Sequence, residues 1–472
     1  MAIVNESSFA PVLAAMRRGS CEGALQDDSA ADRCLVCLHA GGTCRSCIAA
    51  ASNDCGCFCP GVGAPPLNIA VLGGSISVDR PPQVAAASDW HDYTWWLERL
   101  LHARVVNRAR AATAVAFTSL CVQDLLPPAA PSPDYTIIEF ATNDAIVFPA
   151  EGAHGLPRRR AAYEMMPNSA GVGPLPSMER LLRRLRALHP RTRPIILYVC
   201  GVGHSRQARL LASQCEGLFS SVARRYGVRE LSLQRELLRT PTRLLSTFLE
   251  NPSASHPKAA GHSAIAWLVA EAIQRGPTYV PALPTPLPAP AFLDGGWEHT
   301  DAPWACRTCV GGSDRCRALP ALARDGWYDD EIYWKSTARG ATLTLGVEGH
   351  TLLMTQCSDW DGGALVVLPS GRTSASEAGG GGAPTGASAG VAAPRSAGAV
   401  PPARRFVLDL KWGAPTGRHF CIADLGYFAC PANVTLRVGR RPKTLGVKVQ
   451  ALITQQTLQP SDGGGVSSGA CV

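Results

Sequence analysis

Short apolar runs and amphipathic helical patterns alternate along residues 67–275 of the chain. Four runs are short and rich in β-branched residues, which is typical of buried parallel strands; they cover residues 68–72, 104–107, 135–141 and 194–199. Apolar residues recur at helical spacing in the segments between and after them, over residues 90–100, 117–125, 176–189, 205–225 and 258–274. This alternation predicts a parallel sheet with helices on both faces, the three-layer α/β/α fold.

The pattern changes after residue 275. Prolines are closely spaced over residues 276–300, which predicts an extended, semi-rigid linker. Beyond it, apolar and polar residues alternate with period two, over residues 341–347, 351–356, 364–368, 406–410, 434–438 and 445–453. Short strands of this kind predict a separate β-sandwich domain over residues 301–460. Residues 371–402 are of low complexity and predict a disordered insertion, and residues 461–472 predict a flexible tail.

Polar residues that could do chemistry stand at the ends of three predicted elements. Ser75 follows the first strand through two glycines, Asn143 follows the strand over 135–141, and His256 precedes the last helix. Open α/β sheets bind ligands outside the carboxyl ends of their strands, so these side chains are expected to meet there. The alternative for Ser75 is an ordinary strand-to-helix turn in which its side chain caps the next helix.

These positions together resemble the sequence blocks of the SGNH hydrolases, the GDSL-type esterase superfamily. Gly-Gly-Ser-Ile-Ser at 73–77 resembles its nucleophile block, Ala-Thr-Asn-Asp at 141–144 its asparagine block, and the segment 256–262 its histidine block. The resemblance covers about residues 67–275 and implies a flavodoxin-like parallel sheet. The β-rich C-terminal region loosely resembles that of algal and plant-like members.

The resemblance implies a role for each of the three residues. Ser75 would be the nucleophile, and His256 would be the base, because imidazole titrates near neutral pH. An attacked ester carbonyl becomes an oxyanion, which needs hydrogen-bond donors held in place. The Asn143 side chain and the Ser75 backbone N–H would supply two of them.

A third oxyanion donor is expected from a segment that resembles the second block of the family, residues 107–113. The family has a glycine there, which is replaced here by alanine, either Ala112 or Ala109. Ala112 is the preferred candidate, and an alanine N–H donates as well as a glycine N–H. Gly74 and Asp144 are expected to contribute to substrate binding.

The acid of the usual triad is missing. The family carries Asp three residues before the catalytic His, and here that position is Ser253. A backbone carbonyl near Ser253 could orient His256 in a Ser–His dyad, Glu250 could reach in from a rearranged loop, or the site could be degraded. Loss of the acid costs roughly 10⁴ in kcat in serine protease triads, yet catalysis persists.

These observations predict a serine esterase that needs no cofactor or metal. Its expected substrate is a carboxylic ester, with O-acetylated carbohydrate as a candidate because attached β-sandwiches often bind glycans. The alternatives are a glycan-binding protein with a degenerate pocket and an acyltransferase to a sugar. A monomer is expected.

Charge and hydropathy argue against nucleic acid and membrane partners. The 472 residues are 46% hydrophobic and 17% charged, with a net charge of +8. The densest basic spots, residues 158–160 and 183–184, are interpreted as solvated helix faces. No apolar run reaches the roughly 18 residues of a membrane span.

The eighteen cysteines favour an oxidising compartment, either outside the cell or in the endomembrane lumen. Many of them lie in a Cys-rich segment over residues 1–66, where the spacing fits a disulfide knot better than a zinc site, although Cys-x₂-Cys pairs keep zinc open as an alternative. The first residues lack the basic and apolar regions of a signal peptide. Either the protein is not secreted by that route or the sequence begins at the wrong methionine. The cysteines singled out are Cys21, Cys34, Cys37, Cys44, Cys47, Cys55, Cys57 and Cys59, with a second group at Cys306, Cys309 and Cys316.

Overall fold

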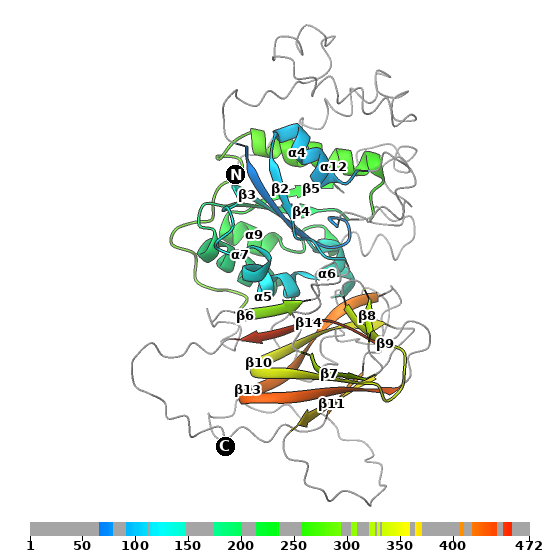
Figure 1. The fold of residues 1–472 in the computed structure, drawn as a ribbon. Coiled ribbons are helices and arrows are strands. Elements are labelled where there is room, and N and C mark those ends of the chain that lie inside the picture. The colour runs from blue at the N-terminus through cyan, green and yellow to red at the C-terminus, as the bar shows by residue number, and fades with distance from the viewer. Residues whose placement is uncertain are drawn as a thin grey trace, which may run out of the picture. The chain divides into compact units, whose positions relative to one another are not determined.

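The computed structural model divides the chain into two compact units, with a boundary between Asp301 and Ala302 (Figure 1). The structure describes residues 66–78, 91–111, 113–147, 173–200, 214–233, 235, 256–293, 304–308, 321–325, 328–330, 333–358, 364–370, 406–409, 418–440 and 447–455. Residues 1–65, the insertion at 371–402 and the tail at 461–472 lie outside these ranges, so the predictions for them stay predictions.

The first unit is built on a five-stranded parallel sheet with the strand order β2-β1-β3-β4-β5. Its strands are β1 (Asn68–Gly73), β2 (Arg104–Asn107), β3 (Tyr135–Glu139), β4 (Arg193–Tyr198) and β5 (Arg229–Ser232). This is the flavodoxin-like order, in which the chain changes direction across the sheet between β1 and β3. The predicted α/β fold is therefore confirmed.

Helices cover both faces of this sheet (Figure 1). One layer contains α4 (Tyr93–Leu101) and α12 (Ala259–Gln274), which pack against each other over the apolar core. The other contains α5 (Val115–Leu125), α7 (Pro174–Leu188) and α9 (Ser220–Tyr226). None of the helices within the described ranges has the length and apolarity that crossing a membrane requires.

Helix α4 carries three aromatic residues, Tyr93, Trp95 and Trp96. Asp92 caps the start of the helix, and its Oδ1 accepts the backbone N–H of Trp95 at 2.9 Å. The Trp95 ring stacks on His91, with 3.6 Å between centroids, and the Arg99 guanidinium lies 3.1 Å from the Trp95 ring centre. The partly buried ring of Trp95 thus contacts His91, Arg99 and the apolar core.

Two predicted elements differ from the structure. The strand predicted over 135–141 ends at Glu139, and a short helix, α6 (Ala141–Val147), begins immediately after it. Asn143 therefore lies in the first turn of a helix and not at a strand end. The helix predicted over 205–225 is interrupted by a turn at residues 216–219, where Gly217 has φ +77°, and α9 begins only at Ser220.

Residues 276–293, the described part of the predicted linker, are bound to the first unit. The buried carboxylate of Glu179 in α7 accepts the backbone N–H groups of Ala291, Phe292 and Leu293. Arg183 donates to the carbonyl of Pro288 at 2.8 Å. This stretch contains no helix or strand and turns at residues 277–279, and side chains of α7 hold it against the sheet unit.

The interpretation of residues 183–184 as a solvated basic face is wrong. Arg183 also donates to the hydroxyl of Tyr226, and Arg184 donates to the carbonyls of Ser119 and Leu120. Both guanidinium groups therefore satisfy carbonyl or hydroxyl oxygens inside the unit. Guanidinium donors are suited to this because they carry five N–H groups in a fixed geometry.

The second unit is a separate antiparallel β domain, as predicted. It has a nine-stranded sheet around two long paired strands, β10 (Thr342–Ser358) and β13 (Arg418–Arg440). Their pairing shifts register near Gly349, which has φ +67°. The predicted strands over 341–347 and 351–356 are one strand, β10, and whether the domain packs as two sheets stays a prediction. The remaining strands are β6 (Trp304–Thr308), β7 (Ala321–Asp325), β8 (Tyr328–Asp330), β9 (Tyr333–Ser336), β11 (Ala364–Ser370), β12 (Phe406–Asp409) and β14 (Val447–Gln455).

Candidate active site

A tight turn at the carboxyl end of β1 carries Ser75. The Gly74 N–H donates to the Glu139 carbonyl at 2.9 Å, which ties the turn to the end of β3, and the Ser77 N–H donates to the Gly74 carbonyl at 3.1 Å. Ser75 is partly exposed, whereas its neighbours on both sides are buried. The turn thus presents the Ser75 side chain beside β3, at the position where a flavodoxin-like sheet forms its ligand crevice.

His256 reaches Ser75 across 181 residues of sequence. The distance between Ser75 Oγ and His256 Nε2 is 2.9 Å, which is hydrogen-bond contact. His256 lies three residues before the start of α12, so the packing of α12 on α4 fixes where the ring enters the crevice. The expected contact between the two side chains is present. For Nε2 to accept the hydroxyl proton, the ring must carry its own proton on Nδ1.

Asn143 is the third residue of the group. Its side chain is 7% exposed, and Nδ2 donates to the carbonyl of Thr113 at 2.7 Å, which fixes the orientation of the amide. An amide nitrogen carries two N–H groups, so one remains for another acceptor. A Cβ built on Gly74 would overlap Nδ2, so the amide of Asn143 lies directly against the turn that carries Ser75.

The segment after β2 continues alongside β1 toward the same turn. Arg108 and Arg110 donate their backbone N–H groups to the carbonyls of Val71 and Gly73, each at 2.8 Å. The N–H of Ala109 donates to Asn107 Oδ1 at 3.0 Å and is therefore not available to an oxyanion. Ala112 lies outside the described residues, and it stays the predicted third donor.

Ser253 and Glu250 both lie outside the described residues, so the dyad, the rearranged loop and the degraded site all stay open as predictions.

The sequence pattern of the GDSL-like lipase/acylhydrolase family matches residues 71–264. The match spans Ser75, Asn143 and His256, which the structure brings together. Residues 71–264 form a domain of this family. The chain is accordingly a hydrolase that acts on ester bonds.

Solved structures similar to the chain include several esterases. A two-domain esterase active on acetylated mannans, co-crystallised with mannopentaose, is 15% identical, with 83% of this chain and 91% of that chain covered and a TM-score of 0.47. An acetyl xylan esterase is 11% identical, with 44% and 100% covered and a TM-score of 0.32. A lipolytic protein of the G-D-S-L family from Desulfitobacterium hafniense DCB-2 is 14% identical, with 43% and 98% covered and a TM-score of 0.30. No curated protein matches the chain.

The side chain of Asp144 in the GDSL-like domain hydrogen-bonds to the start of a helix. Its side chain is fully buried, and Oδ2 accepts the backbone N–H of Val115 at 3.0 Å, at the start of α5. This hydrogen bond satisfies one of the N–H groups that a helix start leaves without an intrahelical partner. Burial raises the pKa of Asp144 to about 8. Its part in substrate binding stays a prediction.

Glu139 lies beneath the turn that carries Ser75, and the sequence pattern did not single it out. Its Oε2 accepts the hydroxyl of Ser77 at 3.0 Å and the N–H of Gly74 at 3.3 Å. Burial raises the pKa of Glu139 to about 8, against the effect of these two hydrogen bonds. A glutamate inside an otherwise apolar strand was the available signal, because a buried carboxyl group needs partners.

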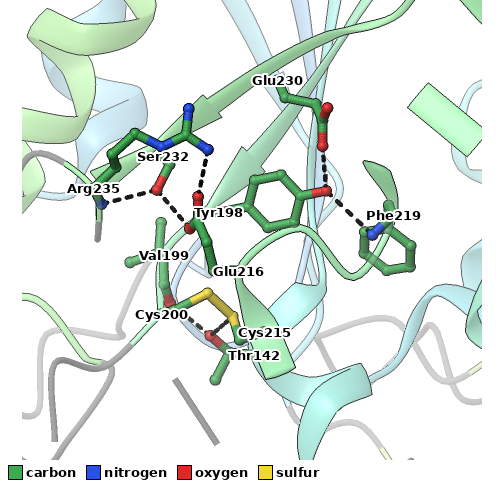
Figure 2. Close-up of a disulfide and its surroundings, with 10 residues drawn as sticks. All are labelled: Thr142, Tyr198, Val199, Cys200, Cys215, Glu216, Phe219, Glu230, Ser232 and Arg235. Carbon is green, nitrogen blue, oxygen red and sulfur yellow. Dashed lines mark hydrogen bonds and ion pairs between the residues drawn. A yellow bond between two sulfur atoms is a disulfide. The ribbon is translucent and has the colours of Figure 1, made fainter. Parts of the chain in front are cut away.

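A disulfide ties the end of β4 to the segment before α9, and it too was not foreseen (Figure 2). Cys200 and Cys215 form this bond, and both are buried. The hydroxyl of Thr142, next to Asn143, donates to the carbonyl of Val199 at 2.5 Å and lies 3.6 Å from Cys215 Sγ. Cys121 and Cys306 are disulfide-bonded as well. Within the described ranges, no cluster of side chains suited to a metal ion is found.

Proposed function

We propose that the GDSL-like domain hydrolyses a carboxylic ester through an acyl-enzyme on Ser75. The observation that carries this proposal is the 2.9 Å contact between Ser75 Oγ and His256 Nε2 at the carboxyl end of β1. A serine hydroxyl is a weak nucleophile until a base within hydrogen-bond reach removes its proton. His256 is in that position.

In the acylation step, Ser75 Oγ attacks the carbonyl carbon of the ester while His256 Nε2 takes the hydroxyl proton. The tetrahedral intermediate collapses, the bond to the alcohol oxygen breaks, and the imidazolium returns its proton to the departing alcohol. In the deacylation step, water attacks the acyl-enzyme and His256 takes a proton from it. The bond to Oγ then breaks, and the proton returns to Ser75.

The oxyanion of each tetrahedral intermediate would be held beside Gly74. The position of Asn143 supports this placement of the oxyanion, because the Thr113 carbonyl orients its amide and the amide lies directly against Gly74. The Ser75 N–H has no hydrogen-bond partner in the part of the chain that the structure describes, and it is the second donor we propose. Ala112 N–H is the third. Preorganised donors of this kind contribute about 3–4 kcal/mol each in related chemistry.

For the substrate we propose the acetyl esters of carbohydrate expected from the sequence. Transfer of the acetyl group to a sugar would use the same residues, with a sugar hydroxyl in place of water in the second step. Acetate released from an acetylated polysaccharide, measured with and without added sugar acceptor, separates hydrolysis from transfer.

The experiment that tests the esterase proposal is covalent labelling of Ser75 with a fluorophosphonate probe, together with hydrolysis of p-nitrophenyl acetate. Ser75→Ala should abolish both. Ser177→Ala is the matched control, because the Ser177 hydroxyl is buried in α7 and has no hydrogen-bond partner among the residues that the structure describes. A wild-type protein that is folded but neither labelled nor active would refute the proposal and leave glycan binding without turnover.

The missing acid has a test of its own. We propose that Ser253→Asp raises the rate of p-nitrophenyl acetate hydrolysis, because it restores an acid at the family position. Recovery of a large part of the roughly 10⁴-fold effect of a triad acid would support a site that has merely lost its carboxylate. A change of less than about threefold would support orientation of His256 by another group.

A further inference from the structure

The carboxyl group of Glu139 is buried under the turn that carries Ser75. Glu139 is 1% exposed and is the last residue of β3, the strand that leads to Asn143. Its Oε2 accepts two hydrogen bonds, from the Gly74 N–H and from the Ser77 hydroxyl, and these residues flank Ser75 closely on both sides. One side chain of β3 therefore contacts the nucleophile turn before and after the serine.

Ser77 connects this carboxyl group to two further elements. Its Oγ lies 2.7 Å from the hydroxyl of Tyr93, the first residue of α4, and its backbone carbonyl accepts the Asn107 side chain at 2.6 Å. A Cβ on Gly73 would fall within 2.8 Å of both Cβ and Oγ of Ser77. Glycine at position 73 thus leaves the space in which the Ser77 hydroxyl meets Glu139 and Tyr93.

Tyr93 extends the network toward the histidine. Its ring is fully buried and is stacked on the ring of His262, with 6.2 Å between centroids and 10° between planes. His262 lies in α12, the helix that begins three residues after His256. A continuous path of contacts therefore runs from the strand before Asn143, under Ser75, to the helix after His256.

We propose that Glu139 is a positioning residue of the esterase site, which holds Ser75 in line with His256 and Asn143 through the Ser77 hydroxyl and the Gly74 N–H. This inference rests on the proposed function and adds a residue that touches no substrate. Its physical basis is that a shift of about 1 Å in a reacting group can cost roughly 10²-fold in rate.

The geometry also favours the neutral form of the carboxyl group. An anion next to Gly74 would stand beside the place where the ester oxyanion develops and would oppose it electrostatically. The groups that face Glu139 or lie close to it are Tyr93, Ser77 and Asp144. Burial raises the pKa of Tyr93 and that of Asp144. The charge of Asp144 also raises the pKa of Glu139, in addition to the effect of burial. None of them supplies a positive charge that would stabilise a Glu139 carboxylate. The neutral acid keeps an acceptor oxygen for both hydrogen bonds.

The test compares Glu139→Gln, Glu139→Ala and Ser77→Ala with wild type and with the Ser177→Ala control. Glutamine keeps an acceptor oxygen without a charge, so kcat for p-nitrophenyl acetate should stay within about threefold of wild type. Glu139→Ala and Ser77→Ala should lower kcat and the rate of Ser75 labelling by roughly 10–100-fold, with KM changed by less than about twofold. If Glu139→Ala does not fold, Ser77→Ala still tests the inference, because this substitution removes only one hydroxyl group.

The pH profile gives a readout that a purely structural role would not change. Wild-type kcat/KM should fall as Glu139 ionises in alkaline solution, and Glu139→Gln should keep its activity there. Equal kcat in folded Ser77→Ala and wild type, or an alkaline limb that persists in Glu139→Gln, would overturn the inference. If wild type itself is not labelled at Ser75, it is the proposed function that fails.

Discussion

The side-chain amide of Asn143 lies directly against the α-carbon of Gly74, with no room for a methyl group between them. The two residues follow neighbouring strands, β3 and β1, and the amide is held from the other side by the Thr113 carbonyl. The contact explains why glycine precedes the proposed nucleophile. Any side chain at position 74 would displace the Asn143 amide, which is the proposed oxyanion donor.

We therefore expect Gly74→Ala to lower kcat for p-nitrophenyl acetate by roughly 10²–10³-fold, the usual effect of losing one oxyanion donor. KM should change little, because the ester is still bound. Steady-state kinetics and the rate of fluorophosphonate labelling measure this. Gly173→Ala is the matched control, because within the described part of the chain a Cβ at Gly173 meets only Pro176, at an ordinary 3.5 Å. Wild-type kcat in Gly74→Ala would show that Asn143 does not act as a donor.

The sequence was sufficient to bring Ser75, Asn143 and His256 together, because each stands beside an element end in a fold whose strand order concentrates such ends in one crevice. It was not sufficient for the local structure around Asn143. The apolar run over 135–141 reads as one strand, whereas the strand ends at Glu139 and Asn143 lies in α6. The pairing of β3 with β1 ends at Glu139 and Gly73, whereas the apolar run continues past this point, so the run does not mark where the strand ends.

Other elements were missed because their signals are weak or non-local. β5 has only four residues, Arg229–Ser232, and polar residues interrupt its alternation. The Cys200–Cys215 bond could not be read from spacing, because cysteine count does not determine pairing. The same limit applied to Glu139, whose partners lie 62 and 65 residues away in the chain.

Two variants of Asp144 distinguish a role in folding stability from a role in substrate binding. Asp144→Ala leaves the Val115 N–H buried without its acceptor and should lower the free energy of unfolding by about 1–3 kcal/mol. Asp144→Asn keeps an acceptor oxygen and should be close to wild type at neutral pH. Denaturant unfolding and steady-state kinetics measure the two effects. A KM that rises at least tenfold in both variants would mean that Asp144 contacts the substrate after all.

Stability should depend on pH through the two buried carboxyl groups. The folded pKa of Glu139 and that of Asp144 are each raised to about 8, from ordinary values of 4.5 and 3.8. The folded state therefore binds more protons than the unfolded state between these limits. Its stability is fully present below about pH 4, and it falls as pH rises toward 8, by up to about 1.4 kcal/mol per pH unit for each group.

Glu139→Gln and Asp144→Asn remove one titrating group each, so each variant should flatten this decline. Thermal unfolding recorded from pH 5 to pH 9 measures it, and both variants should gain Tm relative to wild type at the alkaline end. A wild-type Tm that rises from pH 5 to pH 8 would contradict the raised pKa values of both groups.

The Cys200–Cys215 bond should stabilise the GDSL-like domain and restrict movement of the first turn of α6, which carries Asn143. The bond closes a loop of 15 residues, for which chain entropy predicts about 3 kcal/mol of stability. The Thr142 hydroxyl contacts Cys215 Sγ and the Val199 carbonyl, so this end of β4 supports the residue next to Asn143 (Figure 2).

The double variant Cys200→Ala with Cys215→Ala should therefore lose stability in denaturant unfolding and should also label more slowly at Ser75. Thr142→Val serves as the comparison, because it removes the hydroxyl and leaves the disulfide. If slower labelling follows Thr142→Val as well, support of Asn143 runs through the hydroxyl. If the double variant loses stability but both variants label at the wild-type rate, the disulfide stabilises the fold without acting on the site.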